Sequence, residues 1–204
     1  METHQTPTYP STFDGLLSLV ARLRGEDGCP WDREQTHTSL RPHLLEECYE
    51  LLEAIDTGDI DGVREELGDI LVHVAFHADM ARRVGEFGAT EVIEEAVTKL
   101  IRRHPHVFAN KLVGSATHQN REWEGYKADE REARAAAEGR PPSALDGVAL
   151  ALPALLRAEK LQRRASRVGF DWPDIAPVID KVIEEIEEVT TLKLVGSEHG
   201  LVVV

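Results

Sequence analysis

The chain has 204 residues, of which 42% are hydrophobic, and it carries a formal net charge of −14 with a pI near 5.1. A chain of this length and composition can bury a core as one or two domains. The acidic balance argues against a general nucleic-acid binder, which would normally present a basic surface. No apolar run approaches the roughly 18 residues of a membrane span, and the N-terminus lacks a basic stretch followed by an apolar one. We therefore expect a soluble, cytoplasmic protein with no membrane and no nucleic acid among its partners.

Apolar residues recur at helical spacing along most of the chain, and no convincing alternating strand pattern precedes the last few residues. This periodicity predicts an all-α fold class. The helices expected ahead of residue 140 are approximately 13–24, 42–57, 62–84, 89–103 and 118–138. A turn-rich loop, Gly25 to Pro30, follows the first of them.

The segment 139–143, Gly-Arg-Pro-Pro-Ser, has the composition of a linker, and an internal repeat follows it. Residues 152–161 resemble the first helix, residues 169–174 resemble the loop around Trp31, and residues 184–188 repeat the EExxE pattern of residues 46–50. An ExxD helix is missing from the second copy, because a divergent sequence stands in its place. We therefore expect two domains, a complete unit over residues 1–140 and a partial repeat with a divergent tail over residues 141–204.

Two acidic motifs, EExxE at residues 46–50 and ExxD at residues 66–69, lie on consecutive predicted helices. With about 100° per residue, Glu46, Glu47 and Glu50 share one arc, and Glu66 and Asp69 are one turn apart. These carboxylates would converge if the helices pack antiparallel. Two carboxylates about 5 to 6 Å apart repel by roughly 3 kcal/mol at an effective dielectric of about 20, so a converged cluster needs a cation. Hard oxygen ligands favour Mg²⁺ or Mn²⁺, and the implied substrate is a phosphate ester or anhydride.

A solvated acidic face is the alternative for the first motif, because the apolar stripe from Leu44 to Ile55 lies on the opposite side of that helix. The same stripe makes Cys48 a candidate core thiol. The second helix has two apolar stripes nearly opposite one another, with Glu66 and Asp69 between them. Such a helix is expected to pack on both sides, which favours a protein-lined cavity for these two acids.

Taken together, the motifs resemble those of the MazG nucleoside triphosphate pyrophosphohydrolases. The similar runs are EExxE and ExxD with fifteen residues between them, GCPWD at residues 28–32 followed by Gln35-Thr36, and RRHPHVF at residues 102–108. The resemblance covers approximately residues 13–190. It implies a helical bundle that cleaves an NTP or dNTP to the monophosphate and pyrophosphate, in housecleaning of damaged nucleotides or control of nucleotide levels. Members of this family usually dimerise, so the resemblance also implies a homodimer or a higher homo-oligomer.

The resemblance assigns roles to the acidic residues. It implies that Glu47, Glu50, Glu66 and Asp69 hold Mg²⁺, and that Glu46 orients or deprotonates the attacking water. Because metal ions lower the pKa of bound water and clamp phosphate oxygens, this reaction requires no protein nucleophile.

Basic and aromatic residues near the motifs are candidates for binding the nucleotide, because triphosphate hydrolysis needs cations that neutralise the transferring group. The basic candidates are Lys99, Arg102, Arg103 and Lys127. For the first three, the alternative is an interaction with the C-terminal dipole of their helix. Trp31 is a candidate for stacking on the base, with packing as its alternative role.

The histidines offer no metal-ligand spacing as clean as that of the acids. His73 and His77 are one turn apart on the same predicted helix, and their spacing leaves open whether either contacts the site. His104 and His106 flank Pro105, and we expect them to shape a turn.

Two other functional classes remain open from the sequence. A catalytically silent MazG-like protein that serves as an interaction or regulatory module is consistent with the incomplete second repeat. An unrelated carboxylate-metal bundle, such as a di-iron protein, would need a Glu-x-x-His pair, whereas Glu50 is followed at the third position by Glu53. An assay with Mg²⁺ and a panel of nucleotides separates an enzyme from the silent module.

Overall fold

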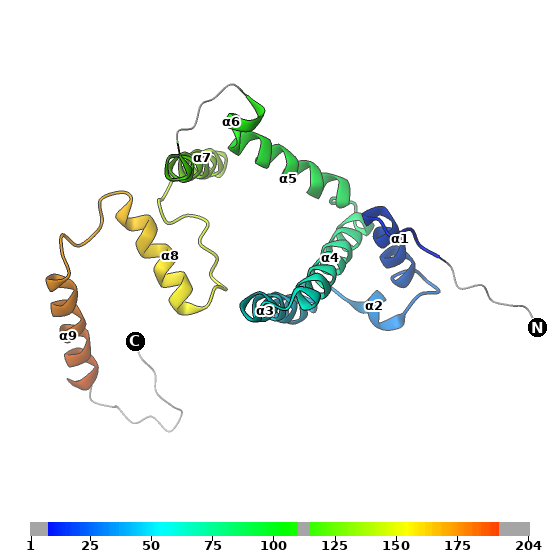
Figure 1. Cartoon of the computed structure of the whole chain (residues 1–204), viewed down its shortest axis with the longest axis horizontal. Helices are drawn as coiled ribbons and strands as arrows, with labels where there is room; N and C mark the ends of the chain where they lie inside the picture. The colour runs from blue at the N-terminus through cyan, green and yellow to red at the C-terminus, as the bar shows by residue number, and fades with distance from the viewer. Residues whose placement is uncertain (1–7, 110–114, 192–204) are drawn as a thin grey trace, which may run out of the picture. The chain divides into compact units, whose positions relative to one another are not determined.

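The computed structural model describes residues 8–109 and 115–191, so the tail 192–204 of the predicted partial repeat lies outside the described residues. In chain order the helices are α1 (Phe13–Leu23), α2 (Pro30–Glu34), α3 (Arg41–Thr57), α4 (Ile60–Arg83), α5 (Ala89–Arg103), α6 (Pro105–Phe108), α7 (Ala116–Ala137), α8 (Ala154–Ser166) and α9 (Ala176–Thr191) (Figure 1). The described ranges contain no β-strand. The predicted all-α fold class is confirmed.

Two short helices, α2 and α6, were not expected from the sequence. The structure places α2 where the sequence indicated only a turn-rich stretch, and α6 where it indicated a turn around Pro105. Each carries a proline in its first turn, where the fixed φ of proline suits a helix and its missing N–H costs nothing. Helices of four and five residues are too short to show an apolar period, which explains why the pattern missed them.

The chain divides into two compact units, residues 1–112 and 113–204, and each is described by itself. By packing, α7 belongs to the second unit, whereas the linker composition at 139–143 favoured a boundary after it. The predicted functional division near residue 140 stays a prediction.

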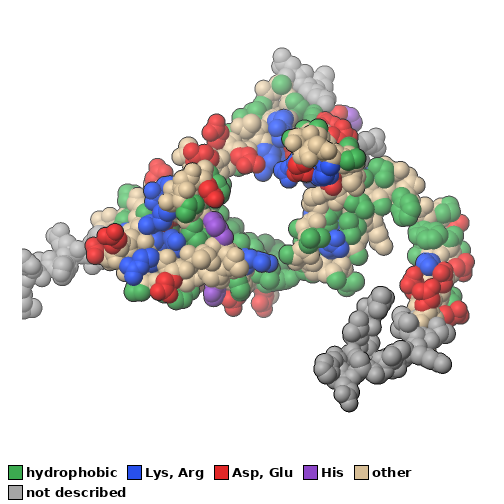
Figure 2. Space-filling model, turned by 180° about the vertical axis from the view of Figure 1, so that it is seen from behind, with side chains coloured by type: hydrophobic (Ala, Val, Ile, Leu, Met, Phe, Trp, Pro, Cys, Tyr) green, Lys and Arg blue, Asp and Glu red, His purple; other side chains and the backbone are tan. Residues whose placement is uncertain are grey.

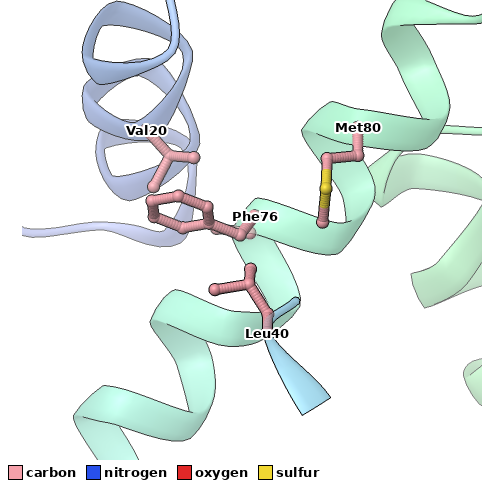
Figure 3. Close-up of a cluster of buried hydrophobic side chains, with 5 residues drawn as sticks. Val20, Leu40, Phe76 and Met80 are labelled. Carbon is pink, nitrogen blue, oxygen red and sulfur yellow. The ribbon is translucent and has the colours of Figure 1, made fainter. Parts of the chain in front are cut away.

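The core of the first unit forms around α4, which packs against α1, α3 and α5. Figure 3 shows its centre, where Val20 of α1 faces Phe76 of α4, with Met80 one turn further along and Leu40 from the segment that leads into α3. All four side chains are at least nine-tenths buried. Burial of such side chains contributes about 1.5–3 kcal/mol each, so this cluster holds α1 and the start of α3 onto α4.

A buried carboxylate on α4 links the loop after α1 to that helix. Asp79 accepts hydrogen bonds from Nε of Arg24 at 3.1 Å and from Arg82 and Arg83 at 2.7 and 2.5 Å. The Arg24 guanidinium also donates to the carbonyl oxygens of Asp32 and Gln35, at the two ends of the turn that closes α2. Through Arg24, the buried Asp79 therefore fixes the segment that carries Trp31.

A two-residue turn joins α3 to α4 and makes them an antiparallel hairpin. Gly58 ends α3 with φ of 72°, in the left-handed region that glycine adopts at little cost. Asp59 then caps α4, since its carboxylate accepts from the amides of Asp61 and Gly62, both at 3.1 Å. A Cβ on Gly62 would lie 2.9 Å from the Asp59 carboxylate and 3.2 Å from the Ala54 side chain, so this glycine permits the tight turn.

Part of the apolar surface of the hairpin is not covered. The stripe of α4 that contains Phe76 is buried, but Leu67 and Leu71 on the other stripe are 48% and 47% exposed. The expectation that α4 packs on both sides is met in part, because α4 packs against α1 and α3 while Leu67 and Leu71 stay about half exposed. Cys48 of α3 is also exposed, so the prediction of a core thiol is wrong. The reason is the same in both cases, since apolar periodicity identifies a face but not what covers it.

The second unit consists of α7, α8 and α9 with their connections. Glu124 of α7 accepts from Lys127 on the same helix and from Arg167 at the end of α8. Arg140 bonds Asp146 at 2.7 Å in the segment between α7 and α8. Figure 2 shows hydrophobic side chains on the molecular surface, and several of them belong to α9, whose Ile179, Val182, Ile183 and Ile186 are about half exposed.

Within the described ranges, no helix has the length and apolar character needed to cross a membrane.

Candidate functional site

The α3–α4 hairpin brings the two acidic motifs to the same height. Glu47 lies eleven residues before Gly58 and Asp69 eleven after it, while Glu50 and Glu66 each lie eight residues from the same glycine. Because both helices rise about 1.5 Å per residue in opposite directions, each pair is level across the hairpin. The tight turn thus sets the register that matches EExxE with ExxD.

Three of the predicted metal ligands meet in space. Glu47, Glu66 and Asp69 each offer a carboxylate oxygen, and these three oxygens lie within 4.8 Å of one another. Two oxygens that each lie about 2.1 Å from one Mg²⁺ ion are about 3.0 Å apart in adjacent octahedral positions and about 4.2 Å apart in opposite ones. The cluster therefore needs only a small contraction to hold such an ion.

An unpartnered buried oxygen marks the same place. Oε2 of Glu66 is buried and accepts no hydrogen bond. A buried carboxylate oxygen without a donor costs free energy, and a bound cation would remove that cost. The donor set, all carboxylate oxygen, suits a hard divalent ion such as Mg²⁺ or Mn²⁺ rather than a thiolate-seeking metal.

The surroundings raise the pKa of two members of the trio. Partial burial raises the pKa of Glu47, and the nearby charges of Asp69, Glu50 and Glu66 raise it further. Burial also raises the pKa of Glu66, with Glu50 and Asp69 as the next causes. Both shifts report crowded negative charge that a cation would relieve.

The other two acids of the first motif differ in position. Glu50 lies beside the trio, because its carboxylate raises the pKa of both Glu47 and Glu66. Glu46 lies apart from the trio, with a side chain that is 64% exposed and an oxygen 3.8 Å from Nδ1 of His43. The structure thus groups four of the five acids that the sequence singled out.

The described residues enclose these acids only in part, so the expected protein-lined cavity is incomplete among them. Glu66 is half-buried, but Asp69 is exposed. Leu67 and Leu71, on the neighbouring apolar stripe of α4, also remain about half exposed.

The candidate nucleotide-binding residues are dispersed over several elements. Trp31 on α2 is 55% exposed and meets the His43 ring edge-on, with centroids 6.1 Å apart. On α5, Lys99 and Arg103 are half-buried and Arg102 is exposed, in the last two turns of the helix. Lys127 belongs to the second unit, where it bonds Glu124 at 3.1 Å and lies over the Trp123 ring.

Sequence reasoning did not single out His43, although the structure places it between Trp31 and Glu46. The spacing could have shown it, because His43 precedes Glu46 by three residues and so lies on the same helical face. His37 was also missed. It precedes α3, and only the tertiary fold brings it to His77 of α4, with their Nδ1 atoms 2.7 Å apart.

Comparison with known proteins agrees with the arrangement of the two motifs. The MazG nucleotide pyrophosphohydrolase domain matches residues 35–108, which include every acid of the hairpin cluster.

Full-length relatives match over most of this chain. The chain is 47% identical over 178 residues to a nucleoside triphosphate pyrophosphohydrolase of Escherichia coli K12, covering 87% of this chain and 66% of the relative. It is 45% identical over 182 residues to the nucleoside triphosphate pyrophosphohydrolase/pyrophosphatase MazG of Thermotoga maritima, covering 89% and 67%. A nucleoside triphosphate pyrophosphohydrolase of Mycobacterium tuberculosis is 41% identical over 156 residues, which are 76% of this chain and 45% of that protein. The chain therefore spans about two thirds of the length of the first two, and it belongs to the MazG family of nucleotide pyrophosphohydrolases.

Proposed function

We propose that this chain is a Mg²⁺-dependent enzyme that hydrolyses a nucleoside triphosphate, NTP or dNTP, to the monophosphate and pyrophosphate. The observation that carries the proposal is the carboxylate trio of Glu47, Glu66 and Asp69, in which Glu66 has a buried oxygen without a hydrogen-bond partner. Relatives that match most of this chain are named for this reaction. The proposal extends that activity to the present chain, which is shorter than they are.

In this proposal four acids of the hairpin hold the ion, and Glu46 accepts a proton from the attacking water. Glu47, Glu50, Glu66 and Asp69 supply oxygen ligands from two helices whose register is fixed by one turn. When bound, Mg²⁺ supplies the positive charge that clamps phosphate oxygens and lowers the pKa of the attacking water. Mn²⁺ has the same ligand preference and is the expected substitute.

Glu46 is suited to accept a proton from the attacking water because it stands outside the ligand set. Its carboxylate is exposed, with one oxygen 3.8 Å from Nδ1 of His43. A carboxylate oxygen that is not committed to the metal can hydrogen-bond the water and take its proton. Glu46→Gln should lower turnover by about 10²–10⁴-fold while Mg²⁺ still binds.

The nucleotide itself is proposed to contact residues beyond the acids. Trp31 has an open ring face on which a base can stack, and Arg24 anchors its segment to α4. Lys99, Arg102 and Arg103 are the proposed phosphate contacts on α5, and the role expected of Lys127 stays a prediction. Trp31→Ala should raise KM more than it lowers kcat if stacking serves binding alone.

We also propose a homodimer, because the hairpin that carries the site leaves apolar side chains uncovered. On α3, Leu45, Tyr49, Leu52 and Ile55 are each more than half exposed. Together they form an apolar surface on α3 that a second copy of the chain can cover. Sedimentation equilibrium should give twice the chain mass, and Leu52→Asp should give a monomer. A wild-type monomer at tens of micromolar would contradict the dimer.

A nucleotide panel tests the activity. The chain is incubated with canonical and modified triphosphates and Mg²⁺, and products are separated by chromatography. A monophosphate and pyrophosphate are expected. Absence of turnover with every nucleotide, in protein that still binds Mg²⁺, would favour the silent interaction module instead.

A further inference from the structure

A second group of possible ligands, all imidazoles, lies on the first unit and begins at His73, one turn after Asp69 on α4. The rings of His37 and His77 are nearly parallel, with centroids 4.9 Å apart and an interplanar angle of 10°. Their Nδ1 atoms are 2.7 Å apart. His73, one turn earlier on α4, has its ring centroid 6.4 Å from that of His77. Two separate segments, the one before α3 and α4 itself, thus direct imidazoles to one place.

The close nitrogen pair restricts the protonation of these rings. Two Nδ1 atoms at 2.7 Å can share one proton, but they cannot both carry one. Burial lowers the pKa of His77, and the neighbouring His37 and His73 lower it further. A lowered pKa favours the neutral His77 ring, which keeps a lone pair and is the form that binds a metal.

His73 supplies an independent observation. Its side chain is more than nine-tenths buried, and its Nδ1 atom has no hydrogen-bond partner. Burial lowers the pKa of this ring as well, with His43 as the next cause. A buried ring nitrogen without a partner is costly unless it gains a donor or a metal.

We propose that His37, His73 and His77 form a binding site for a transition-metal ion that prefers nitrogen ligands, such as Zn²⁺, separate from the carboxylate site for Mg²⁺. Imidazole suits Zn²⁺, Ni²⁺ and Cu²⁺, whereas Mg²⁺ takes oxygen ligands, so the two clusters select different ions. Two histidines four residues apart on a helix are a common part of zinc sites, with a third ligand from another segment.

The His37–His77 pair is close to the geometry that such an ion requires, whereas the nitrogens of His73 do not yet lie within reach of the same ion. Two nitrogens that each lie about 2.0–2.1 Å from a tetrahedral Zn²⁺ are about 3.3 Å apart, and their ring centroids are about 5 Å apart. The His37–His77 centroids already meet this value at 4.9 Å, and their nitrogens must separate from 2.7 Å by roughly 0.6 Å. His73, at 6.4 Å from His77, must turn toward the pair by a side-chain rotation.

An ion held in this way would link the segment before α3 to α4. His37 lies three residues before Leu40, which packs into the core against α4. This link would act together with the hydrogen bond that Arg24 donates to the carbonyl oxygen of Gln35, two residues before His37. Zn²⁺ should therefore raise the melting temperature independently of Mg²⁺.

Co²⁺ is the probe for the test, because its visible absorption bands report nitrogen ligation. The whole chain is titrated with Co²⁺ in a large excess of Mg²⁺, which occupies the carboxylates. The wild type and the control variant Glu66→Gln should show the same bands. His37→Asn, at an exposed position outside the helices, and His77→Asn should each weaken binding by at least the roughly 10–100-fold that loss of an outer-sphere partner costs.

Two results would overturn the proposal. One is wild-type protein that shows no Co²⁺ bands in excess Mg²⁺. The other is a band that disappears in Glu66→Gln but persists in both histidine variants, which would place Co²⁺ on the acids. Imidazole ¹H–¹⁵N spectra of the wild type with Zn²⁺ test His73 without a substitution in the core. Its resonances should shift together with those of His37 and His77, and unchanged His73 resonances would remove it from the ligand set.

Discussion

Asp79 and Glu66 are acids on the same helix whose surroundings shift the pKa in opposite directions. Burial alone would raise the pKa of Asp79, but hydrogen bonds from Arg83 and Arg82 outweigh burial and hold it below its usual value. Burial and neighbouring acids raise the pKa of Glu66, and one of its oxygens has no donor. Arginine side chains neutralise the Asp79 carboxylate, whereas Glu66 keeps a buried oxygen that a cation could satisfy. This difference separates a structural acid from a candidate ligand.

Asp79→Asn should destabilise the fold strongly. Removing one partner of a buried ion pair costs about 3–5 kcal/mol, because Arg24 would stay buried without its counter-charge. Asp61→Asn is the matched control on the same helix, since Asp61 is 83% exposed in its pair with Arg64 and such pairs contribute about 0–1 kcal/mol. Urea unfolding measures both. Equal, small losses for the two variants would contradict the role assigned to Asp79.

The stabilisation by Mg²⁺ should depend on pH with a defined sign. Because the folded chain raises the pKa of Glu47 and Glu66, the metal-free protein binds more protons folded than unfolded, and it loses stability as pH rises through that range. Mg²⁺ needs the deprotonated acids and reverses the trend. Melting curves should show a shift with Mg²⁺ that is small below the usual carboxylate pKa and grows as pH rises toward neutrality. At 100 times the Kd the gain is about 2.7 kcal/mol. An equal shift with Na⁺ at matched ionic strength would indicate an ordinary solvated face.

At the scale of elements, the α3–α4 hairpin is what turns two sequence motifs into one cluster. Its register depends on the turn at Gly58 and on the cap at Asp59. The consequence is that substitutions at the turn, far from any ligand, should disturb the site.

Gly58→Ala should destabilise the hairpin by about 1 kcal/mol, because alanine at φ of 72° is strained. Gly68→Ala is the contrasting variant. A Cβ there meets nothing within 4 Å, and the helix should gain about 0.5–1 kcal/mol. Thermal melts of both, with the Kd for Mg²⁺, check the pair. If Gly58→Ala leaves stability and Mg²⁺ affinity unchanged, the turn does not set the register.

Helical periodicity was sufficient to predict the long helices, since each has a clear apolar face and a terminating residue. The equal distances of the two motifs from Gly58 made their convergence predictable as well. Other features depend on tertiary contacts that no local pattern records. The Nδ1 contact of His37 with His77 spans forty residues, and the exposure of Cys48 depends on a face that this chain leaves uncovered. The short helices α2 and α6 lack any period to detect.

At the scale of the whole molecule, the second EExxE pattern lies in different surroundings from the first. On α9, Lys181 forms salt bridges with Glu184 at 2.7 Å and with Glu185 at 3.2 Å. Within the described residues, the acids of α9 do not form a cluster that could hold a metal ion. Lys181 stands three residues before Glu184, where His43 stands before Glu46. Lys181 thus offsets part of the negative charge of Glu184 and Glu185, which lowers their need for a bound cation.

We therefore predict that activity depends on the first unit. Changing Glu185 and Glu188 together to Gln should leave turnover within about twofold, whereas the matching pair Glu47 and Glu50 should be essential. Steady-state kinetics with circular dichroism as the folding control measures both. A comparable loss in the α9 variant would show that the second unit supplies ligands, and would overturn the one-site account.

The central claim, metal-dependent attack of water at the α-phosphorus by the hairpin acids, is tested most directly by hydrolysis in H₂¹⁸O with Mg²⁺, using the wild type and Asp69→Asn. Mass spectrometry of the products locates the new oxygen. The account predicts one ¹⁸O in the nucleoside monophosphate, none in the pyrophosphate, and no turnover above background in a folded Asp69→Asn. Label in pyrophosphate, release of inorganic phosphate with a diphosphate, or full activity of Asp69→Asn would contradict it.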